Sequence, residues 1–254
     1  MKYAGWSRRL LPKGRRLSLG GLHRVWRLSA MVMVSLLVAA FMATPTLEAA
    51  PVRGGVLRVA LAAEPPGLDP SASTSQEIAR MVYNNLYEGL VKIDRHGRIV
   101  PALAREWEIS GDAMTYIFHL REGVRFHDGT PFTSADVVAK FQRALDPQSG
   151  HTNAQYYRSI EAVEAPDPHT VVFRLSEPDA ELLFNLARPD SVIAPAGRYE
   201  SQRTHPIGTG PFRFVEWVRG SHVRLERFED YYHPELPYLD AVVFRFMPDP
   251  SSQL

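Results

Sequence analysis

The sequence contains no cysteine among its 254 residues. This absence excludes disulfide bridges, metal sites built from thiolates and catalysis by a cysteine nucleophile. It also excludes a lipid anchor attached to a cysteine near the N-terminus. No pattern in the remaining residues requires a cofactor, so the expected cofactor content is none.

Positive charge is scarce beyond residue 50. The whole chain holds 29 basic and 28 acidic residues, but residues 1–50 contain eight of the basic residues and a single acidic one, Glu48. Residues 51–254 therefore carry 21 basic against 27 acidic residues, a net charge of −6. Nucleic acid is a poor partner for such a chain, because its phosphates require clustered Lys and Arg.

A membrane-spanning run is also missing. The apolar stretch at residues 28–43 is interrupted by Ser29 and Ser35, and it is shorter than the roughly 20 residues that a spanning helix needs. It follows a basic segment and precedes small residues and proline at residues 44–51. This order is typical of a secretory leader that is removed.

We therefore expect residues 1–50 to be a signal peptide, cut near Ala49 or Ala50, and the mature chain to be periplasmic. The pair Arg8-Arg9 resembles a twin-arginine export motif, whereas its distance from the apolar run fits a general basic leader. Both export routes are compatible with this sequence.

Short strands are predicted where apolar and polar residues alternate between turn residues. They cover residues 56–61, 115–120, 124–126, 160–165, 170–175, 212–218, 222–228 and 241–247. The turn residues at 121–123 and 219–221 predict hairpins between their neighbouring strands. Residues 64–70, rich in proline, predict an exposed loop after the first strand.

Helices are predicted from apolar residues that recur every three to four positions. One such helix runs from Gln76 to about Leu90, a second begins at Thr133 or Ser134, and a third is short, at residues 181–186. A short helix or turn at residues 99–103 is expected to place Trp107. Strands and helices mix without regular alternation, which favours an α+β or mixed α/β fold.

Several strings of residues in fixed order carry a resemblance to one family. They include Gly54-Gly55-Val56-Leu57-Arg58-Val59, Leu68-Asp69-Pro70, Asn85-Leu86-Tyr87-Glu88-Gly89-Leu90, Trp107-Glu108-Ile109-Ser110, Phe126-His127-Asp128-Gly129-Thr130-Pro131-Phe132-Thr133 and Pro206-Ile207-Gly208-Thr209-Gly210-Pro211-Phe212. From about Gly54 onward the chain resembles the extracellular solute-binding proteins of family 5, the peptide-, dipeptide- and nickel-binding components of ABC importers.

The resemblance implies a periplasmic binding protein-like fold of class II, cluster C type. A ligand would lie in a cleft that closes by a hinge motion. Residues 51–83 and 190–254 would form parts of the main lobe, and residues 84–189 a smaller inserted domain. Members of this family continue into a second lobe, so the sequence is expected to be truncated before that lobe.

The implied function is binding of oligopeptides, dipeptides or a similar small solute, in partnership with the permease subunits of an ABC importer in the inner membrane. Catalysis is not expected. The alternatives are a nickel- or haem-binding member of the same family, a truncated fragment without function, or a periplasmic hydrolase, which would need a nucleophile beside a base.

By family position, the loop at residues 71–76 and the stretch at residues 153–157 are expected to approach the ligand. The candidate ligand-binding residues are Ser73, Thr74, Ser75, Gln76, Tyr156 and Tyr157. The two tyrosines can equally be core or surface residues, because Tyr is intermediate in burial.

Two other motifs favour structural roles. Gly208-Thr209-Gly210 lacks the spacing of a phosphate-binding loop and is interpreted as a crossover bend near the hinge. His127-Asp128 precedes a turn and has no partner histidine at ligand spacing, so no metal site is predicted there.

Overall fold

The computed structural model describes residue 33 and residues 51–249. The predicted leader, apart from residue 33, and residues 250–254 lie outside the described residues. Contacts separate residues 1–50 from a second unit, Pro51–Leu254, which carries the sheets and cavities. Among the described residues, no helix is both long enough and apolar enough to cross a membrane.

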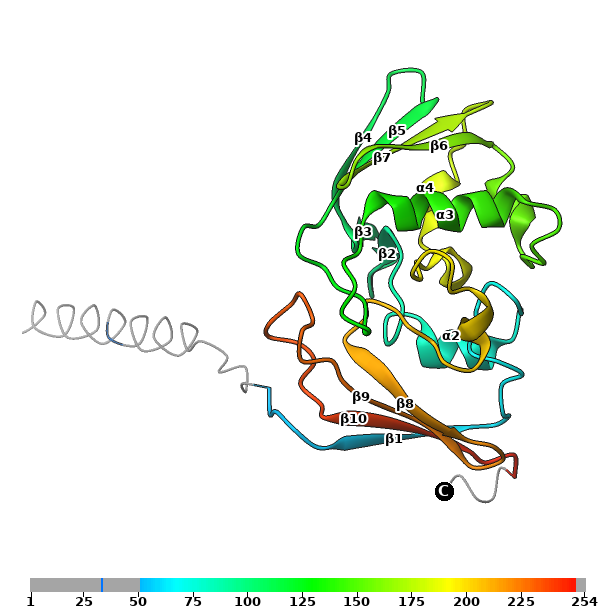
Figure 1. The fold of residues 1–254 in the computed structure, drawn as a ribbon. Helices are drawn as coiled ribbons and strands as arrows, with labels where there is room; N and C mark the ends of the chain where they lie inside the picture. The colour runs from blue at the N-terminus through cyan, green and yellow to red at the C-terminus, as the bar shows by residue number, and fades with distance from the viewer. Residues whose placement is uncertain (1–32, 34–50, 250–254) are drawn as a thin grey trace, which may run out of the picture. The chain divides into compact units, whose positions relative to one another are not determined.

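One four-stranded sheet joins the first and last strands of the described chain (Figure 1). Its strands, in spatial order, are β1 (Val56–Leu61), β10 (Ala241–Phe246), β9 (His222–Arg227) and β8 (Phe212–Val218). β1 runs parallel to β10, with Val59 opposite Phe244, and the other two pairs are antiparallel. This pairing brings residues far apart in sequence into one sheet.

A second four-stranded sheet is formed by residues in the middle of the chain. Its strands, in spatial order, are β4 (Ala104–Ile109), β5 (Thr115–Leu120), β7 (Thr170–Leu175) and β6 (Ile160–Asp167), all antiparallel to their neighbours. β2 (Val91–Ile93) and β3 (Ile99–Pro101) form a separate two-stranded sheet. The mixture of sheets and helices agrees with the predicted fold class.

The helix α3 (Ser134–Leu145) packs on the second sheet, as Figure 1 shows. The Phe141 ring on α3 meets the Phe173 ring on β7 edge to face, with centroids 5.0 Å apart. Such aromatic pairs add to the stability that burial of apolar area provides. The remaining helical segments are α2 (Gln76–Val82), α4 (Leu182–Leu186), η1 (Ala154–Tyr157), η2 (Pro189–Ser191) and η3 (Glu200–Arg203).

Buried apolar residues form two clusters. One cluster surrounds the second sheet and draws its side chains from residues 90–187 and from Ile193. The other lies between the first sheet and α2 and uses residues 61–87 and 192–244. The chain therefore passes from one core to the other near Glu88 and returns near residues 187–194.

The helix α3 begins where the sequence predicts it. Thr133 is the N-cap residue, and its backbone N–H donates to Oδ2 of Asp136, 2.9 Å away. The other carboxylate oxygen of Asp136 accepts from the backbone N–H of Ala196, at 3.0 Å. Asp136 thus ties the start of the helix to a segment of the return crossing.

Replacing Asp136 by alanine should lower the free energy of unfolding by about 2 kcal/mol, because two backbone donors lose a charged acceptor. Urea unfolding followed by circular dichroism measures this loss. Asp146, at the opposite end of α3, serves as the matched control, and Asp146→Ala should cost less than half as much. Equal losses in the two variants would contradict the assigned role of Asp136.

Three predictions about local structure were wrong. The helix from Gln76 ends at Val82 rather than near Leu90, because Tyr83 is extended and Asn84 adopts a left-handed conformation with φ 57°. Asn tolerates this region better than most residues. Leu86 and Leu90 are buried as the spacing suggested, but they lie in different cores.

The predicted hairpin between residues 115–120 and 124–126 does not form. β5 pairs instead with β4 and β7, while Arg125 makes an isolated bridge to Pro131. Trp107 lies on β4, not after a short helix or turn, and its ring packs against Phe118 with centroids 6.3 Å apart.

Candidate functional site

The loop after β1 folds on its own polar side chains. Oδ1 of Asp69 accepts from the backbone N–H of Ser71 at 2.8 Å and from the Ser71 hydroxyl at 2.6 Å. Oγ of Ser73 accepts from the backbone N–H of Ser75 at 3.2 Å. Asp and Ser favour such turns because their side-chain oxygens accept a hydrogen bond from the backbone N–H two residues further along the chain. The loop therefore presents residues 73–76 in a defined arrangement.

These residues line a cavity of about 320 Å³, here named the loop cavity. Its lining consists of Pro70, Ser73, Thr74, Ser75, Gln76, Ala79, Asn153, Arg188, Pro189 and Asp190. The loop contributes hydroxyl and amide groups to this lining, and Arg188 and Asp190 contribute a charged pair. A volume of this size is at the lower end of the range for small-molecule sites, about 300–1,000 Å³.

The charged pair is contributed by the return crossing between the two cores. Nε of Arg188 donates to Oδ1 of Asp190 over 3.1 Å. The Arg188 guanidinium also lies over the ring of Tyr156, 4.0 Å from its centroid. The Arg188 side chain is partly exposed, whereas that of Asp190 is buried.

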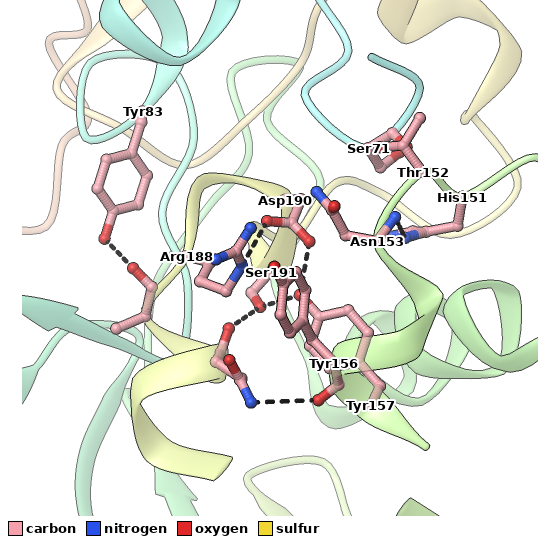
Figure 2. A network of polar contacts seen from close by, with 12 residues as sticks. Ser71, Tyr83, His151, Thr152, Asn153, Tyr156, Tyr157, Arg188, Asp190 and Ser191 are labelled. Atoms are coloured by element: carbon pink, nitrogen blue, oxygen red, sulfur yellow. Dashed lines mark hydrogen bonds and ion pairs between the residues drawn. The ribbon is translucent and has the colours of Figure 1, made fainter. Parts of the chain in front are cut away.

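Asp190 belongs to a buried polar network, in which Tyr157 contacts both Asp190 and Ser191 (Figure 2). The Tyr157 hydroxyl donates to Oδ2 of Asp190 at 2.9 Å and lies 2.6 Å from Oγ of Ser191. Nζ of Lys140 donates to the backbone oxygen of Asp190 at 2.6 Å. Burial raises the pKa of Tyr157, so its hydroxyl remains a donor at neutral pH.

Burial also lowers the pKa values of the two basic side chains of this network, Lys140 and His151. It lowers the pKa of Lys140 to about 8, although the carboxylates of Asp69 and Asp190 act in the opposite direction. It lowers the pKa of His151 to about 4, with a further contribution from the Lys140 charge. The His151 Nε2 atom lies 3.2 Å from Nζ of Lys140. At neutral pH, Lys140 is therefore mostly charged and His151 is neutral.

The structure brings four of the six candidate residues together. Ser73, Thr74, Ser75 and Gln76 all line the loop cavity. Tyr156 does not line it and reaches it only through its stacking on Arg188. Tyr157 has no exposed surface and belongs to the core around the second sheet, with its hydroxyl engaged by Asp190.

The sequence interpretation missed Arg188 and Asp190. A signal for them was present, since two charged residues interrupt the otherwise apolar stretch around residues 182–194. Charged residues are seldom retained in such stretches unless they are paired. Asn153 lies within the stretch that was expected to approach a ligand, and it does line the cavity.

A second cavity, also about 320 Å³, lies beside Tyr156. It is lined by Gln155, Tyr156, Arg158, Ser159, Glu177, Pro178, Asp179, Glu181 and Asn185. The loop and α2 do not contribute to it. Of the candidate ligand-binding residues, only Tyr156 lies on its wall.

The crossings between the cores meet at Glu88. Its buried carboxylate accepts from the hydroxyls of Tyr231 at 2.9 Å, Tyr232 at 2.8 Å and Thr209 at 3.1 Å. Burial raises its pKa despite these hydrogen bonds. The Glu88 backbone oxygen accepts from the N–H of Ile193 at 2.9 Å, so the outgoing and returning chains lie side by side.

The glycines around Thr209 approach this crossing closely. The backbone N–H of Gly210 donates to the Leu86 oxygen at 2.9 Å. The predicted bend is present at Thr209 and Gly210. Across residues 51–249 and at residue 33, no three His, Cys, Asp or Glu side chains gather closely enough to hold a metal ion.

Solved structures show the class of this fold, which is that of the periplasmic binding proteins. The protein AgaA of A. tumefacien R10, in complex with agropinic acid, has a TM-score of 0.74 and 37% identity, covering 78% of this chain and 41% of its own. DppA of Helicobacter pylori, in complex with the peptide STSA, has a TM-score of 0.72 and 32% identity, covering 80% and 44%.

Comparison of sequences identifies the family within this class. The model of the bacterial extracellular solute-binding proteins, family 5 Middle, matches residues 98–254. The glutathione-binding protein GsiB of Pectobacterium atrosepticum is 34% identical over 189 residues, which are 73% of this chain and 36% of that protein. The chain belongs to the family 5 solute-binding proteins. It spans little more than a third of the length of this relative.

Proposed function

We propose that this chain is a periplasmic ligand-binding component of an ABC importer for peptides or similar small solutes, and that it works with the importer's permease subunits. The loop cavity carries the proposal. The loop after β1 contributes hydroxyl and amide groups to one wall, and the return crossing contributes Arg188 and Asp190 to the other. Such groups suit a peptide, whose backbone offers both donors and acceptors.

The named relatives support a peptide-like ligand. GsiB is a glutathione-binding protein, and DppA was solved with a peptide. Glutathione and short peptides share amide groups and carboxylates, so one polar cavity can accommodate this class of solute. This chain spans only part of these relatives. We therefore propose, by similarity to them, both the class of ligand and the partnership with permease subunits.

We also propose the division into a main lobe, residues 51–83 and 190–254, and an inserted domain, residues 84–189. The two buried clusters support it, because their members separate at nearly these positions. The crossings at Glu88 and Ile193 would then connect the main lobe to the inserted domain.

A binding role without catalysis is supported by the environment of the buried histidines. His127 is hydrogen-bonded to the backbone of Gly208 and Gly210, and His151 lies against Lys140 and the backbone of Asn153. A hydrolase would instead place a base against a hydroxyl nucleophile in a cavity. His205 and His222 do lie 3.0 Å from the hydroxyls of Thr204 and Ser221, but neither pair lines the loop cavity or the second cavity. The rings of His127 and His151 therefore serve the packing of the crossings and of the network behind the cavity.

Isothermal titration calorimetry of the full chain tests the proposal with glutathione, tri-alanine and a nickel–histidine chelate. We expect binding of at least one of the first two. Replacing Thr74 and Gln76 together by alanine should weaken that binding about tenfold, the effect of one or two lost hydrogen bonds.

The matched control is Glu177→Ala in the second cavity, which should leave the affinity unchanged. Binding of the nickel chelate alone would favour the metal-binding alternative within the family. Absence of binding to all three probes, or equal affinity for the double variant and the wild type, would count against the proposed site.

A further inference from the structure

A lysine and a histidine that contact residues of the loop cavity are buried against each other. Lys140 belongs to α3 and is 3% exposed, and His151 is 9% exposed. Nζ of the lysine lies 3.2 Å from Nε2 of the histidine. Neither residue is part of the cavity lining, whereas their partners Asn153 and Asp190 are. The pair therefore acts on the cavity only through these partners.

Each ring nitrogen of His151 faces a group that can donate a hydrogen bond. The backbone N–H of Asn153 points to Nδ1, at 3.3 Å (Figure 2). The amino group of Lys140 lies at Nε2 and also donates to the backbone oxygen of Asp190, at 2.6 Å. A charged ammonium has three donors and no acceptor. Both contacts of the ring therefore require an acceptor while Lys140 is charged.

A neutral imidazole cannot accept at both nitrogens, because one of them carries the ring hydrogen. Burial lowers the pKa of His151 to about 4, so the ring is neutral at pH 7 and above. With a charged Lys140, Nε2 accepts, the ring hydrogen lies on Nδ1, and the Asn153 N–H loses its acceptor. With a neutral Lys140, the amine accepts from the N–H at Nε2, and Nδ1 accepts from Asn153.

The surroundings allow Lys140 to change its charge close to neutral pH. Burial lowers its pKa to about 8; the carboxylates of Asp69 and Asp190 act in the opposite direction, and the like charge of Arg143 acts in the same direction. The ring of Tyr157 also faces the pair, and its hydroxyl stays protonated because burial raises its pKa. The carboxylates and the guanidinium keep their charges between pH 7 and 9. Lys140 is therefore the group that titrates in this range.

We propose that Lys140 and His151 form a proton switch that controls the hydrogen bond of Asn153 at the wall of the loop cavity. When the lysine is deprotonated, Nζ passes a proton to Nε2, and Nδ1 releases its own to solvent. One proton leaves, the ring stays neutral, and Nδ1 accepts from the Asn153 N–H. This inference goes beyond the proposed function, and its test needs no ligand.

The switch reaches the loop as well as Asn153. Thr152, between the two residues that the ring connects, donates from its backbone N–H to the oxygen of Ser71 at 3.0 Å. Ser71 is itself fixed by Oδ1 of Asp69. The segment at residues 151–153 therefore joins the switch to both parts of the lining. We expect this wall to be held more firmly above about pH 8 than below it.

Nitrogen-15 NMR of the full, unliganded chain tests the switch, because protonated and unprotonated ring nitrogens have well-separated shifts. Between pH 6.5 and 9.5 the two ring nitrogens of His151 should exchange their shifts, with a midpoint near pH 8. The amide proton of Asn153 should move downfield over the same range as it gains its acceptor. The variant His151→Gln, which lacks the ring, identifies the ring signals.

Lys140→Met removes the titrating amine and keeps the length of the side chain. Its His151 ring should carry the hydrogen on Nε2 at every pH in this range. Lys92→Met is the matched control: it makes the same substitution on β2, outside the cavity lining, and should keep the exchange of shifts.

A wild-type ring that keeps one tautomer from pH 6.5 to 9.5 would overturn the inference, whether or not the Lys140→Met chain folds. An exchange that persists in Lys140→Met would overturn it as well, because another group would then control the ring. Calorimetry with the three solutes decides the proposed function separately, since the ring signals are measured without any of them.

Discussion

Replacing Gly208 by alanine should lower the free energy of unfolding by about 3 kcal/mol, near the upper end of the usual cost of overpacking. A Cβ atom at this position would overlap the backbone oxygen of Leu86 and lie 2.8 Å from Cδ1 of Tyr87. The overlapped atom is backbone at the outgoing crossing, so it cannot move aside by changing a rotamer. The segment that contains Gly208 would have to move away from the outgoing crossing.

Gly111 provides a matched control. It lies outside the left-handed region of φ, and a Cβ atom there would meet no atom within 4 Å. Gly111→Ala should change the free energy of unfolding by less than about 0.5 kcal/mol. Urea unfolding of both variants measures the difference. A Gly208→Ala protein as stable as Gly111→Ala would show that the close approach of Gly208 to Leu86 does not contribute to stability.

The stability of the protein should fall as the pH falls from 6.5 to 4, and His127 should account for about 3 kcal/mol of the loss. The residue is partly buried, its Nδ1 accepts from the Gly208 N–H at 3.2 Å, and its Nε2 donates to the Gly210 oxygen at 3.0 Å. Protonation of Nδ1 would remove the acceptor of the Gly208 N–H. Burial accordingly lowers the His127 pKa to about 4.

The direction of this change in stability follows from proton uptake by the unfolded chain. Between pH 6.5 and 4 the unfolded chain binds a proton at His127 and the folded chain does not, so acidification favours the unfolded state. The stabilisation is fully present above pH 6.5. His151, whose pKa is also lowered to about 4, adds to the same slope.

Urea unfolding at several pH values between 4.5 and 7 measures this slope. Glutamine at position 127 has a donor and an acceptor but does not titrate, so His127→Gln should show a clearly smaller decrease in stability on acidification. The contribution of His151 stays in both proteins and serves as the internal reference. Identical slopes would contradict the assignment of His127 as a buried neutral acceptor.

The sequence predicted those parts of the fold that depend on local patterns. β1, the β6–β7 pair and the β8–β9 hairpin were predicted because alternating residues are bounded by turn residues, and the structure confirms them. The helix cap at Thr133 was also predicted from local residues, and the structure confirms it. These features are determined within a few residues of sequence.

Features that depend on long-range packing were not predicted. The spacing of Leu86 and Leu90 fits one helical face, yet each residue is buried in a different core. β4 was missed because its sequence is mostly exposed and charged, and it becomes a strand through pairing with β5. Pairing partners of β5 cannot be read from its own residues.

The candidate site was likewise predicted only in part. The resemblance to the family led to the loop at residues 73–76, which does line the cavity. Arg188 and Asp190 are about 110 residues further along the chain, and only the fold brings them opposite the loop. Tyr157 was selected with Tyr156, but their adjacent side chains point to different surroundings, one buried and one stacked on Arg188.

The most direct test of the central claim, that this family 5 chain binds a small solute at the loop cavity, is an amide NMR titration of the full, isotope-labelled protein with tri-alanine and glutathione. We predict that the largest shift changes fall on residues 73–76 and on Asn153 and Arg188, while Glu177 and Glu181 in the second cavity change little. Shift changes concentrated at the second cavity, or no change with either solute, would contradict the account.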